Sequence, residues 1–234
     1  MADQEDLKRA VGHAAAAEVH DGAVVGLGTG STARHAIERL GHRVRHEGLS
    51  IVGVPTSVAS ARLAQEVGLP LSTLVEHDVV DITIDGADEV DPALDLIKGG
   101  GGALLREKMV AAATRRQVII VDPSKLVQRL GSRYPLPVEV LDFGVRQVGG
   151  ALRALGCEAT LRPGRGGAGE AFRTDSGNLI IDCRFAHGIA DARWLEAAIN
   201  TIPGVVDNGL FLGRTHLVLV GEAQGIRRLT PPGP

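Results

Sequence analysis

The stretch Ala23-Val-Val-Gly-Leu-Gly-Thr-Gly-Ser-Thr-Ala33 decides the fold. Its first six residues form a short apolar run typical of a buried strand, and a helix is predicted over residues 33–40. Glycines between a strand and a helix let the backbone approach a ligand closely, while the helix N-terminus presents free N–H groups to an anion. The stretch therefore predicts a strand–turn–helix unit that binds an anion, with Ser31 and Thr32 as hydroxyl donors.

The same alternation of strands and helices continues on both sides of this unit. Strands are predicted over residues 50–54, 79–85 and 117–122, with an extended piece at 95–98, and helices over 3–20, 57–67 and 103–115. Asp3 is the predicted N-cap of the first helix. Strands that alternate with helices indicate an α/β protein with a largely parallel sheet.

The pattern changes after about residue 130, where a Pro-rich connector begins. Beyond it we predict a strand, helix, strand, strand and helix over residues 138–141, 143–155, 158–162, 178–185 and 191–200, with a Gly-rich hairpin loop at 163–169. This order is typical of a split βαβ domain. Two later runs, 209–212 and 216–220, are predicted to return to the first sheet. We expect an α/β domain of residues 1–130 and 205–234, and a smaller α+β domain of residues 131–204.

Composition and charge restrict the class of protein. The chain has 234 residues, 44% hydrophobic and 23% charged, with a mean hydropathy of +0.10, which is typical of a globular protein of one or two domains. A net charge of −3 provides no general attraction to nucleic acid or to an anionic membrane. No apolar run reaches about 18 residues, and the acidic N-terminus lacks the apolar core of a signal peptide. We expect a cytoplasmic protein.

Metal-binding and disulfide patterns are absent from the sequence. Cys157 and Cys183 are too few for a disulfide framework and lack zinc-ligand spacing, so buried free thiols are expected. The eight histidines include no HExxH motif, and we expect no metal site.

Lysine is rare in this chain. Of the 25 basic residues, the lysines are Lys8, Lys98, Lys108 and Lys125. Each is a candidate for a role that the planar, always charged arginine cannot fill, although chance and coding bias are an alternative explanation.

The turn after the first strand has three possible roles. From Gly28 it matches G-x-G-x-x-A, the dinucleotide fingerprint. That fingerprint needs an acidic residue at the end of the next strand, but this strand ends Val54-Pro55-Thr56-Ser57. Glu47 lies before the strand instead. A phosphate monoester is therefore favoured, and a dinucleotide or a purely structural turn remains possible.

Two further motifs follow predicted strands. In Asp85-Gly-Ala-Asp88, two carboxylates flank a turn and can accept hydrogen bonds from hydroxyls or move protons; an Asx-type turn is the alternative. In Lys98-Gly-Gly-Gly-Gly102, four successive glycines cost backbone entropy, which indicates N–H groups lining a site beside a cation. A flexible loop is the alternative there.

Two charged motifs complete the set. Glu107, in Arg106-Glu-Lys108, has only apolar helical neighbours: Ala103, Leu104, Val110 and Ala111. A carboxylate on an apolar face is either paired or has a raised pKa, which suits a general base. Its two charged neighbours have similarly apolar surroundings, so the spacing alone does not single out Glu107. The last motif, Asp122-Pro-Ser-Lys125, again follows a strand.

In this order, the five motifs resemble the type A ribose-5-phosphate isomerase family, and the resemblance extends over nearly the whole chain. They are Gly28-Thr-Gly-Ser-Thr-Ala33, Asp85-Gly-Ala-Asp-Glu89, Lys98-Gly-Gly-Gly101, Arg106-Glu-Lys108 and Asp122-Pro-Ser-Lys125. A fourth glycine, Gly102, and the Gly-rich loop 163–169 depart from the family pattern.

The resemblance implies an aldose–ketose isomerase that interconverts ribose 5-phosphate and ribulose 5-phosphate through a cis-enediolate without a cofactor. By this resemblance, Glu107 carries the proton between C1 and C2, and Lys98 with the backbone of residues 99–101 stabilises the oxyanion. Asp85 and Asp88 handle ring opening and hydroxyl protons. The residues implied to bind substrate are Lys8, Thr29, Gly30, Ser31, Thr32, Gly86, Ala87, Gly99, Gly100, Gly101 and Lys125.

The resemblance also implies a Rossmann-like domain, a ferredoxin-like domain and a homodimer or homotetramer. The expected partner is a small sugar phosphate, not nucleic acid or a membrane. Alternative functions are a sugar-phosphate sensor without turnover, a coenzyme A transferase of related architecture that uses a glutamate nucleophile, and an NAD(P)-dependent enzyme.

Overall fold

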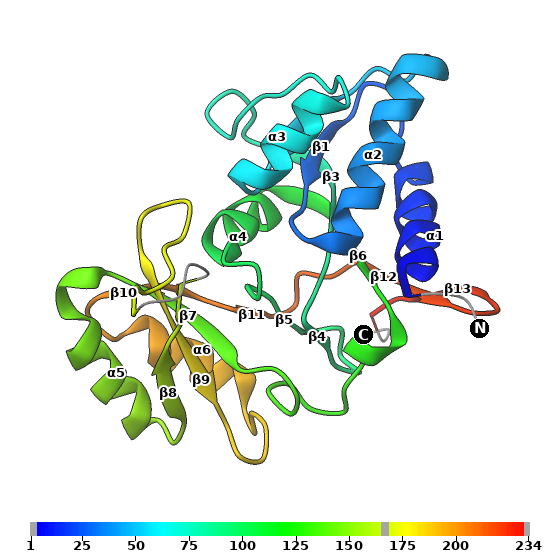
Figure 1. Ribbon diagram of the computed structural model, residues 1–234. Coiled ribbons are helices and arrows are strands. Elements are labelled where there is room, and N and C mark those ends of the chain that lie inside the picture. The colour runs from blue at the N-terminus through cyan, green and yellow to red at the C-terminus, as the bar shows by residue number, and fades with distance from the viewer. Residues whose placement is uncertain (1–3, 165–168, 232–234) are drawn as a thin grey trace. The chain divides into compact units, whose positions relative to one another are not determined.

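A computed structural model describes residues 4–164 and 169–231, and the chain divides into two compact units (Figure 1). Unit 1 comprises Met1–Ala87, Arg106–Leu126 and Gly213–Pro234; unit 2 comprises Asp88–Leu105 and Val127–Leu212. The sequence analysis placed residues 88–105 in the first domain. Their contacts group them with unit 2: the two short strands in this segment pair with each other, and one of them, Leu96–Ile97, also pairs with Leu210–Phe211 of that unit.

Unit 1 is built on a six-stranded sheet in which five neighbouring strands run parallel. In sheet order the strands are β13 (Gly225–Leu229), β12 (Leu217–Glu222), β6 (Thr114–Val121), β3 (Val80–Asp85), β1 (Val24–Leu27) and β2 (Val52–Pro55). Its helices are α1 (Gln4–Ala17), α2 (Ser31–His46), α3 (Val58–Glu66) and most of α4 (Leu104–Ala112), with the 3-10 turn η1 (Pro123–Lys125). The predicted α/β class with a largely parallel sheet is confirmed.

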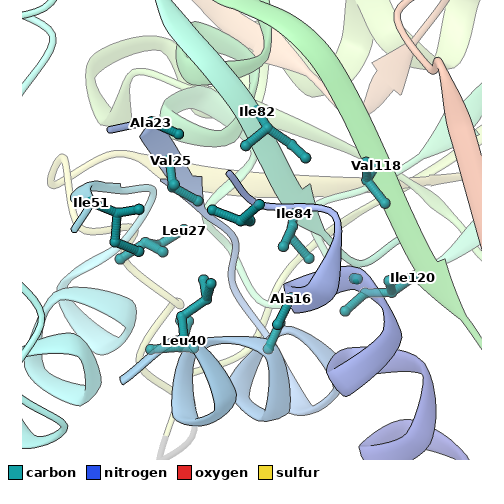
Figure 2. Close-up of a cluster of buried hydrophobic side chains, with 14 of the residues drawn as sticks. Ala16, Ala23, Val25, Leu27, Leu40, Ile51, Ile82, Ile84, Val118 and Ile120 are labelled. Atoms are coloured by element: carbon teal, nitrogen blue, oxygen red, sulfur yellow. The ribbon is translucent and has the colours of Figure 1, made fainter. Parts of the chain in front are cut away.

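The main core of unit 1 lies between one face of this sheet and helices α1, α2 and α3 (Figure 2). Because side chains alternate along a strand, every second residue faces this core: Val25, Leu27, Ile82, Ile84, Val118 and Ile120. Ala16 of α1 and Leu40 of α2 pack against them. On the second face, Val110 of α4 packs with Val54 and Val80. Helices therefore cover both faces, which leaves the strand ends for a site.

The helix predicted over residues 103–115 is too long at its C-terminal end. The helix ends at Ala112, and β6 begins at Thr114, earlier than predicted. Thr114 pairs with Val80, and Arg116 pairs with Ile82 in the parallel ladder of β3. This tertiary pairing outweighs the helical propensity of the segment, as tertiary context commonly does.

Unit 2 is an α+β unit in which the order of elements is βαββαβ. The elements are β7 (Leu136–Val140), α5 (Val145–Ala154), β8 (Glu158–Leu161), β9 (Leu179–Arg184), α6 (Ala192–Asn200) and β10 (Val205–Asn208). The antiparallel sheet has the order β10-β7-β9-β8, as expected of a ferredoxin-like unit. A separate three-stranded sheet contains β4 (Glu89–Val90), β5 (Leu96–Ile97) and β11 (Leu210–Phe211).

Several details differ from the sequence analysis. The run 209–212 was predicted to join the first sheet, but β11 pairs with β5 of unit 2 through Leu210 and Phe211. The strands β4, β10 and β13 were not predicted, since they are short or lack an apolar run. Asp3 and residues 165–168 of the predicted hairpin loop lie outside the described residues.

Two simple expectations can be compared with the structure directly. Cys157 and Cys183 are free and buried, as predicted. Among the described residues, no helix is both long enough and apolar enough to cross a membrane.

Candidate active site

The order of the parallel strands in unit 1 locates a candidate site. Between β2 and β12 the order is β2-β1-β3-β6-β12, so the chain reverses its direction of travel across the sheet between β1 and β3. In open α/β sheets, ligands bind outside the carboxyl ends of the strands at such a switch point. The turn after β1 and the turn after β3 are the Gly28–Thr32 and Asp85–Ala87 motifs.

Asp85 joins these two turns within unit 1. Its fully buried carboxylate accepts the N–H of Thr29 at 3.1 Å and the N–H of Gly86 at 2.8 Å through Oδ1. A Cβ atom at Gly28 would lie only 2.3 Å from that same oxygen. Glycine is therefore required at position 28 by the close approach of the carboxylate, and the two motifs form one structural element.

Hydroxyl groups at the end of the neighbouring strand β2 hold the Thr29 side chain. The Oγ1 atom of Thr29 lies 2.8 Å from the Oγ1 atom of Thr56 and 2.8 Å from the Oγ atom of Ser57. Both partners are almost fully buried. In the sequence analysis, Thr56 and Ser57 were considered only because no acidic residue stands at the end of this strand. Their position after β2, the neighbour of β1, was the signal that they lie beside Thr29.

The N-terminus of α2 projects from the first turn. Gly30 is its N-cap, with φ 113°, and makes no side-chain capping hydrogen bond. Ser31 is exposed and Thr32 is half-buried, and Gly30 has no side chain that could cap the first N–H groups of the helix. Free N–H groups with the positive end of the helix dipole suit a phosphate or another oxyanion.

Glu107 lies at the same edge of the sheet. α4 is the helix that connects β3 to its parallel neighbour β6, so its first turn lies near the carboxyl ends of the strands. The Glu107 side chain is 5% exposed, and its four apolar helical neighbours are buried as predicted. The structure places Lys108 in a buried position too, whereas Arg106 is half-buried.

Lys8 and Lys125 lie on α1 and at the end of η1, and both are half-buried. The Nζ atom of Lys8 lies 3.8 Å from Glu5 on the same helix. Across residues 4–164 and 169–231, no hydrogen bond or ion pair joins either lysine to residues 29–32. The turn that carries Lys125 is capped by Asp122: burial raises the pKa of this carboxyl, but hydrogen bonds from Ser124 and the charge of Lys125 lower it by more.

Unit 2 contains the other predicted site residues, Asp88, Lys98 and Gly99–Gly101. Asp88 contacts the backbone of this glycine run. Its Oδ2 atom accepts the N–H of Gly100 at 2.7 Å. A Cβ atom at Gly100 would lie 2.6 Å from Asp88 Oδ1 and 2.7 Å from the hydroxyl oxygen of Tyr134. We call residues 99–102 the glycine loop. Its glycine content is thus explained in part by the close approach of polar groups, not by flexibility alone.

Lys98 is buried at the start of the glycine loop, with 2% of its surface exposed. Its backbone N–H donates to the carbonyl oxygen of Gly209, and its Nζ atom lies 5.4 Å from the centroid of the Phe211 ring. A cation over an aromatic face is stabilised by the ring quadrupole. This environment fits a lysine that is held in one position.

Two residues near Asp88 were not singled out by the sequence analysis. Glu89 accepts the backbone N–H groups of Gly131, Arg133 and Tyr134, so its carboxylate shapes a loop. Burial and the negative charge of Asp88 raise the pKa of the Tyr134 hydroxyl, which therefore stays a neutral hydrogen-bond donor. Nothing in the local sequence distinguishes Tyr134, because it lies in the Pro-rich connector, far from the motifs.

Among the described residues, no cluster of three or more histidine, cysteine, aspartate or glutamate side chains could hold a metal ion. The polar groups of the two units are instead carboxylates, hydroxyls, lysines and backbone N–H groups. The fold and the groups of unit 1 define a Rossmann-like α/β protein with a polar site at the sheet switch point, and the chain also has a ferredoxin-like unit.

Comparisons with known proteins identify the family. The family model of ribose 5-phosphate isomerase A (phosphoriboisomerase A) matches residues 52–225. The ribose-5-phosphate isomerase A of Thermosynechococcus vestitus is 53% identical, covering 93% of this chain and 92% of its own, and that of Methanothermobacter thermautotrophicus is 47% identical, covering 96% and 97%. The chain belongs to the ribose 5-phosphate isomerase A family.

Solved structures agree with this assignment. The ribose 5-phosphate isomerase A of Methanocaldococcus jannaschii is 47% identical, with a TM-score of 0.91 over 97% of this chain and 100% of that one. A D-ribose-5-phosphate isomerase in complex with phospho-erythronic acid is 38% identical, with a TM-score of 0.93 over 98% and 100%. The predicted family, fold class and enzyme class, an aldose–ketose isomerase, are confirmed, and the sensor and transferase alternatives are not favoured.

Proposed function

We propose that this chain interconverts D-ribose 5-phosphate and D-ribulose 5-phosphate through a cis-enediolate, with Glu107 as the base. The observation that carries the proposal is the burial of Glu107 in the first turn of α4, at the carboxyl edge that also holds Asp85. A carboxylate base shielded from bulk water suits the removal of a weakly acidic C–H proton.

The reaction moves one carbon-bound proton and one pair of electrons. Glu107 removes the proton from C2 of the open-chain aldose, the electron pair forms the C1–C2 double bond, and negative charge develops on the former carbonyl oxygen. The same carboxyl group returns the proton to C1, while a proton also passes between the two oxygens. We assign ring opening and these hydroxyl protons to Asp85 and Asp88.

The developing oxyanion needs donors that are already in position. We assign this role to Lys98 and to the backbone N–H groups of Gly99, Gly100 and Gly101. The burial of Lys98 supports it, because burial reduces the freedom of this donor. The N–H of Gly100 donates to Asp88 in this structure, so it would have to leave that carboxylate to reach the oxyanion. Because the electron pair stays within the substrate, the reaction requires no redox cofactor.

Substrate binding is assigned to the first turn and its neighbours. The N–H groups and hydroxyls of Thr29, Gly30, Ser31 and Thr32 suit the phosphate, and Lys8 and Lys125 supply positive charge. Gly86 and Ala87 complete the contact with the sugar. We further propose a cytoplasmic homodimer or homotetramer.

The direct test is incubation of the purified protein with ribose 5-phosphate alone, with the ketose product followed over time. We expect turnover without added nucleotide or coenzyme A, and equal turnover after exhaustive EDTA treatment. Binding without turnover would support the sensor alternative, and activity that depends on restored Mg²⁺ or Zn²⁺ would contradict the metal-free mechanism.

A further inference from the structure

Arg162 of unit 2 connects a carboxylate to the glycine loop. Its Nε and one terminal nitrogen donate to the two carboxylate oxygens of Asp182 at 2.9 and 2.5 Å. Its other terminal nitrogen donates to the carbonyl oxygens of Gly99 and Gly100 at 2.9 and 3.3 Å. The Arg162 side chain is 12% exposed, and its guanidinium carbon lies 5.7 Å from the centroid of the Phe172 ring.

We propose that Arg162, held by Asp182, is a positioning residue that aligns the oxyanion-stabilising N–H groups of the glycine loop. The proposal rests on the proposed function, because it gives those N–H groups their role. Neither residue belongs to the five motifs, and neither is proposed to touch the substrate.

Peptide planarity links the two sides of the loop. In a trans peptide the C=O and the following N–H point in opposite directions. Arg162 binds the carbonyl of Gly99, and the N–H of the same peptide, that of Gly100, donates to Asp88 at 2.7 Å on the opposite side. Arg162 also binds the carbonyl of Gly100, and this fixes the direction of the N–H in the next peptide, that of Gly101. One guanidinium thus sets two successive peptide planes.

The loop needs such a contact because glycine imposes little conformational preference of its own. Gly99 and Gly102 have φ values of 106° and 84°, in a region that other residues rarely adopt. The Arg162 backbone is itself fixed, since its N–H donates to Ile180 and its carbonyl accepts from Phe172. The loop is therefore bound to a residue anchored on the strand β9.

Lysine cannot replace arginine in this position. The guanidinium uses three nitrogens in one plane to reach a carboxylate and two carbonyls, whereas an ammonium is a single compact donor centre. Arg162→Lys should keep the positive charge but lose the alignment. Misplacement of catalytic groups by about 1 Å can cost roughly 10²-fold in rate.

The test compares steady-state kinetics of Arg162→Lys, Arg162→Gln and Asp182→Asn with the wild type. We expect kcat to fall by about 10- to 100-fold in both Arg162 variants with KM changed less than about twofold, because oxyanion contacts act mainly in the transition state. Asp182→Asn should show a smaller loss of kcat. Amide hydrogen exchange in peptides covering residues 98–104 should become faster in all three variants.

A matched control lies in the same unit. Arg173 also binds a carboxylate, that of Asp142, and a glycine carbonyl, that of Gly177, but it does not contact the glycine loop. Arg173→Gln should therefore leave kcat and the exchange of residues 98–104 unchanged.

Two results would overturn the proposal: wild-type kcat and wild-type exchange in Arg162→Lys, or a rise in KM with kcat retained. If Arg162→Gln fails to fold, the lysine and Asp182→Asn variants still decide between these outcomes. Absence of isomerase activity in the wild type would instead reject the proposed function, and the exchange measurement would then still test whether Arg162 orders the loop.

Discussion

The two glycine-rich turns of this chain look alike in sequence but are held differently. Both precede a helix and both donate a backbone N–H to an aspartate: Thr29 to Asp85 in unit 1, and Gly100 to Asp88 in unit 2. The first ends in an exposed, uncapped helix N-terminus. The second begins at a buried lysine and is bound by Arg162.

This difference separates two tasks of an isomerase. A phosphate keeps its charge throughout the reaction, so an open turn that binds it contributes equally to the ground state and the transition state. An oxyanion exists only on the reaction path, so its donors must already be in position. We expect changes in the first turn to raise KM and changes in the glycine loop to lower kcat.

Of the changes in the two turns, substitution of Lys98 should have the largest effect. Loss of one oxyanion donor typically costs roughly 10²–10³-fold in kcat, and we expect that loss for Lys98→Ala. Lys98→Arg should be nearly as damaging, because a wider planar head does not fit a position that is 2% exposed. Steady-state kinetics of Lys98→Ala and Lys98→Arg measure these losses of kcat. If the arginine variant keeps most of the wild-type kcat, Lys98 supplies only positive potential.

A pair of glycine substitutions compares the two turns directly. Gly100→Ala places a methyl group against Asp88 and Tyr134, and should lower kcat by at least about tenfold. Gly30→Ala has open space but a φ of 113°, so it strains the first turn by about 1–3 kcal/mol and should mainly raise KM. A rise in KM for Gly100→Ala together with a loss of kcat for Gly30→Ala would contradict this comparison.

Lys8→Met should have a smaller effect, confined to binding. Loss of one contact to a charged group corresponds to a rise in KM of roughly tenfold, with kcat retained. The adjacent exposed Arg9, which pairs with Asp6, provides the control: Arg9→Met should leave KM unchanged. A pure loss of kcat in Lys8→Met is the outcome that contradicts phosphate binding.

The smallest expected effect is on stability and concerns the carboxylate of Glu18, which lies outside both turns. Hydrogen bonds from Arg228 and Arg116 lower the pKa of Glu18 despite the opposing effect of partial burial. A depressed folded-state pKa contributes stability above the ordinary pKa of 4.5, and this stability is lost as pH falls through the lower value. Glu18→Gln should reduce stability by about 0.5–1 kcal/mol at pH 7.

Thermal unfolding of Glu18→Gln and the wild type at several pH values measures this difference. The two Tm values should converge well below pH 4, and the kinetics at pH 7 should be the same. A Tm difference that persists at low pH would assign the effect to packing.

Local sequence patterns predicted the elements that carry strong signals. Apolar runs indicated β1, β3 and the second half of β6, and glycine with hydroxyl residues indicated the turn before α2. The start of β6 was missed because Thr114 and Arg116 become strand residues only through pairing with β3. Short edge elements such as β11 also depend on partners remote in sequence.

The site was predictable where motifs are contiguous. Thr29–Thr32, Asp85 and Glu107 were predicted as site residues from glycine spacing, from strand ends and from the resemblance. Arg162 was not, because its role depends on a planar head group that reaches a loop 62 residues earlier in the chain. Apolar helical spacing alone could not separate Glu107 from Lys108, and both are buried.

The most direct test of the mechanism is deuterium exchange at C1 of ribulose 5-phosphate in Glu107→Gln. Glutamine keeps the shape of the side chain and removes the base, so kcat should fall by at least ~10²-fold with KM little changed. Exchange of the C1 proton with deuterated water should disappear together with turnover. If the variant still exchanges this proton at the wild-type rate, another group is the base, and Asp85 is then the next candidate.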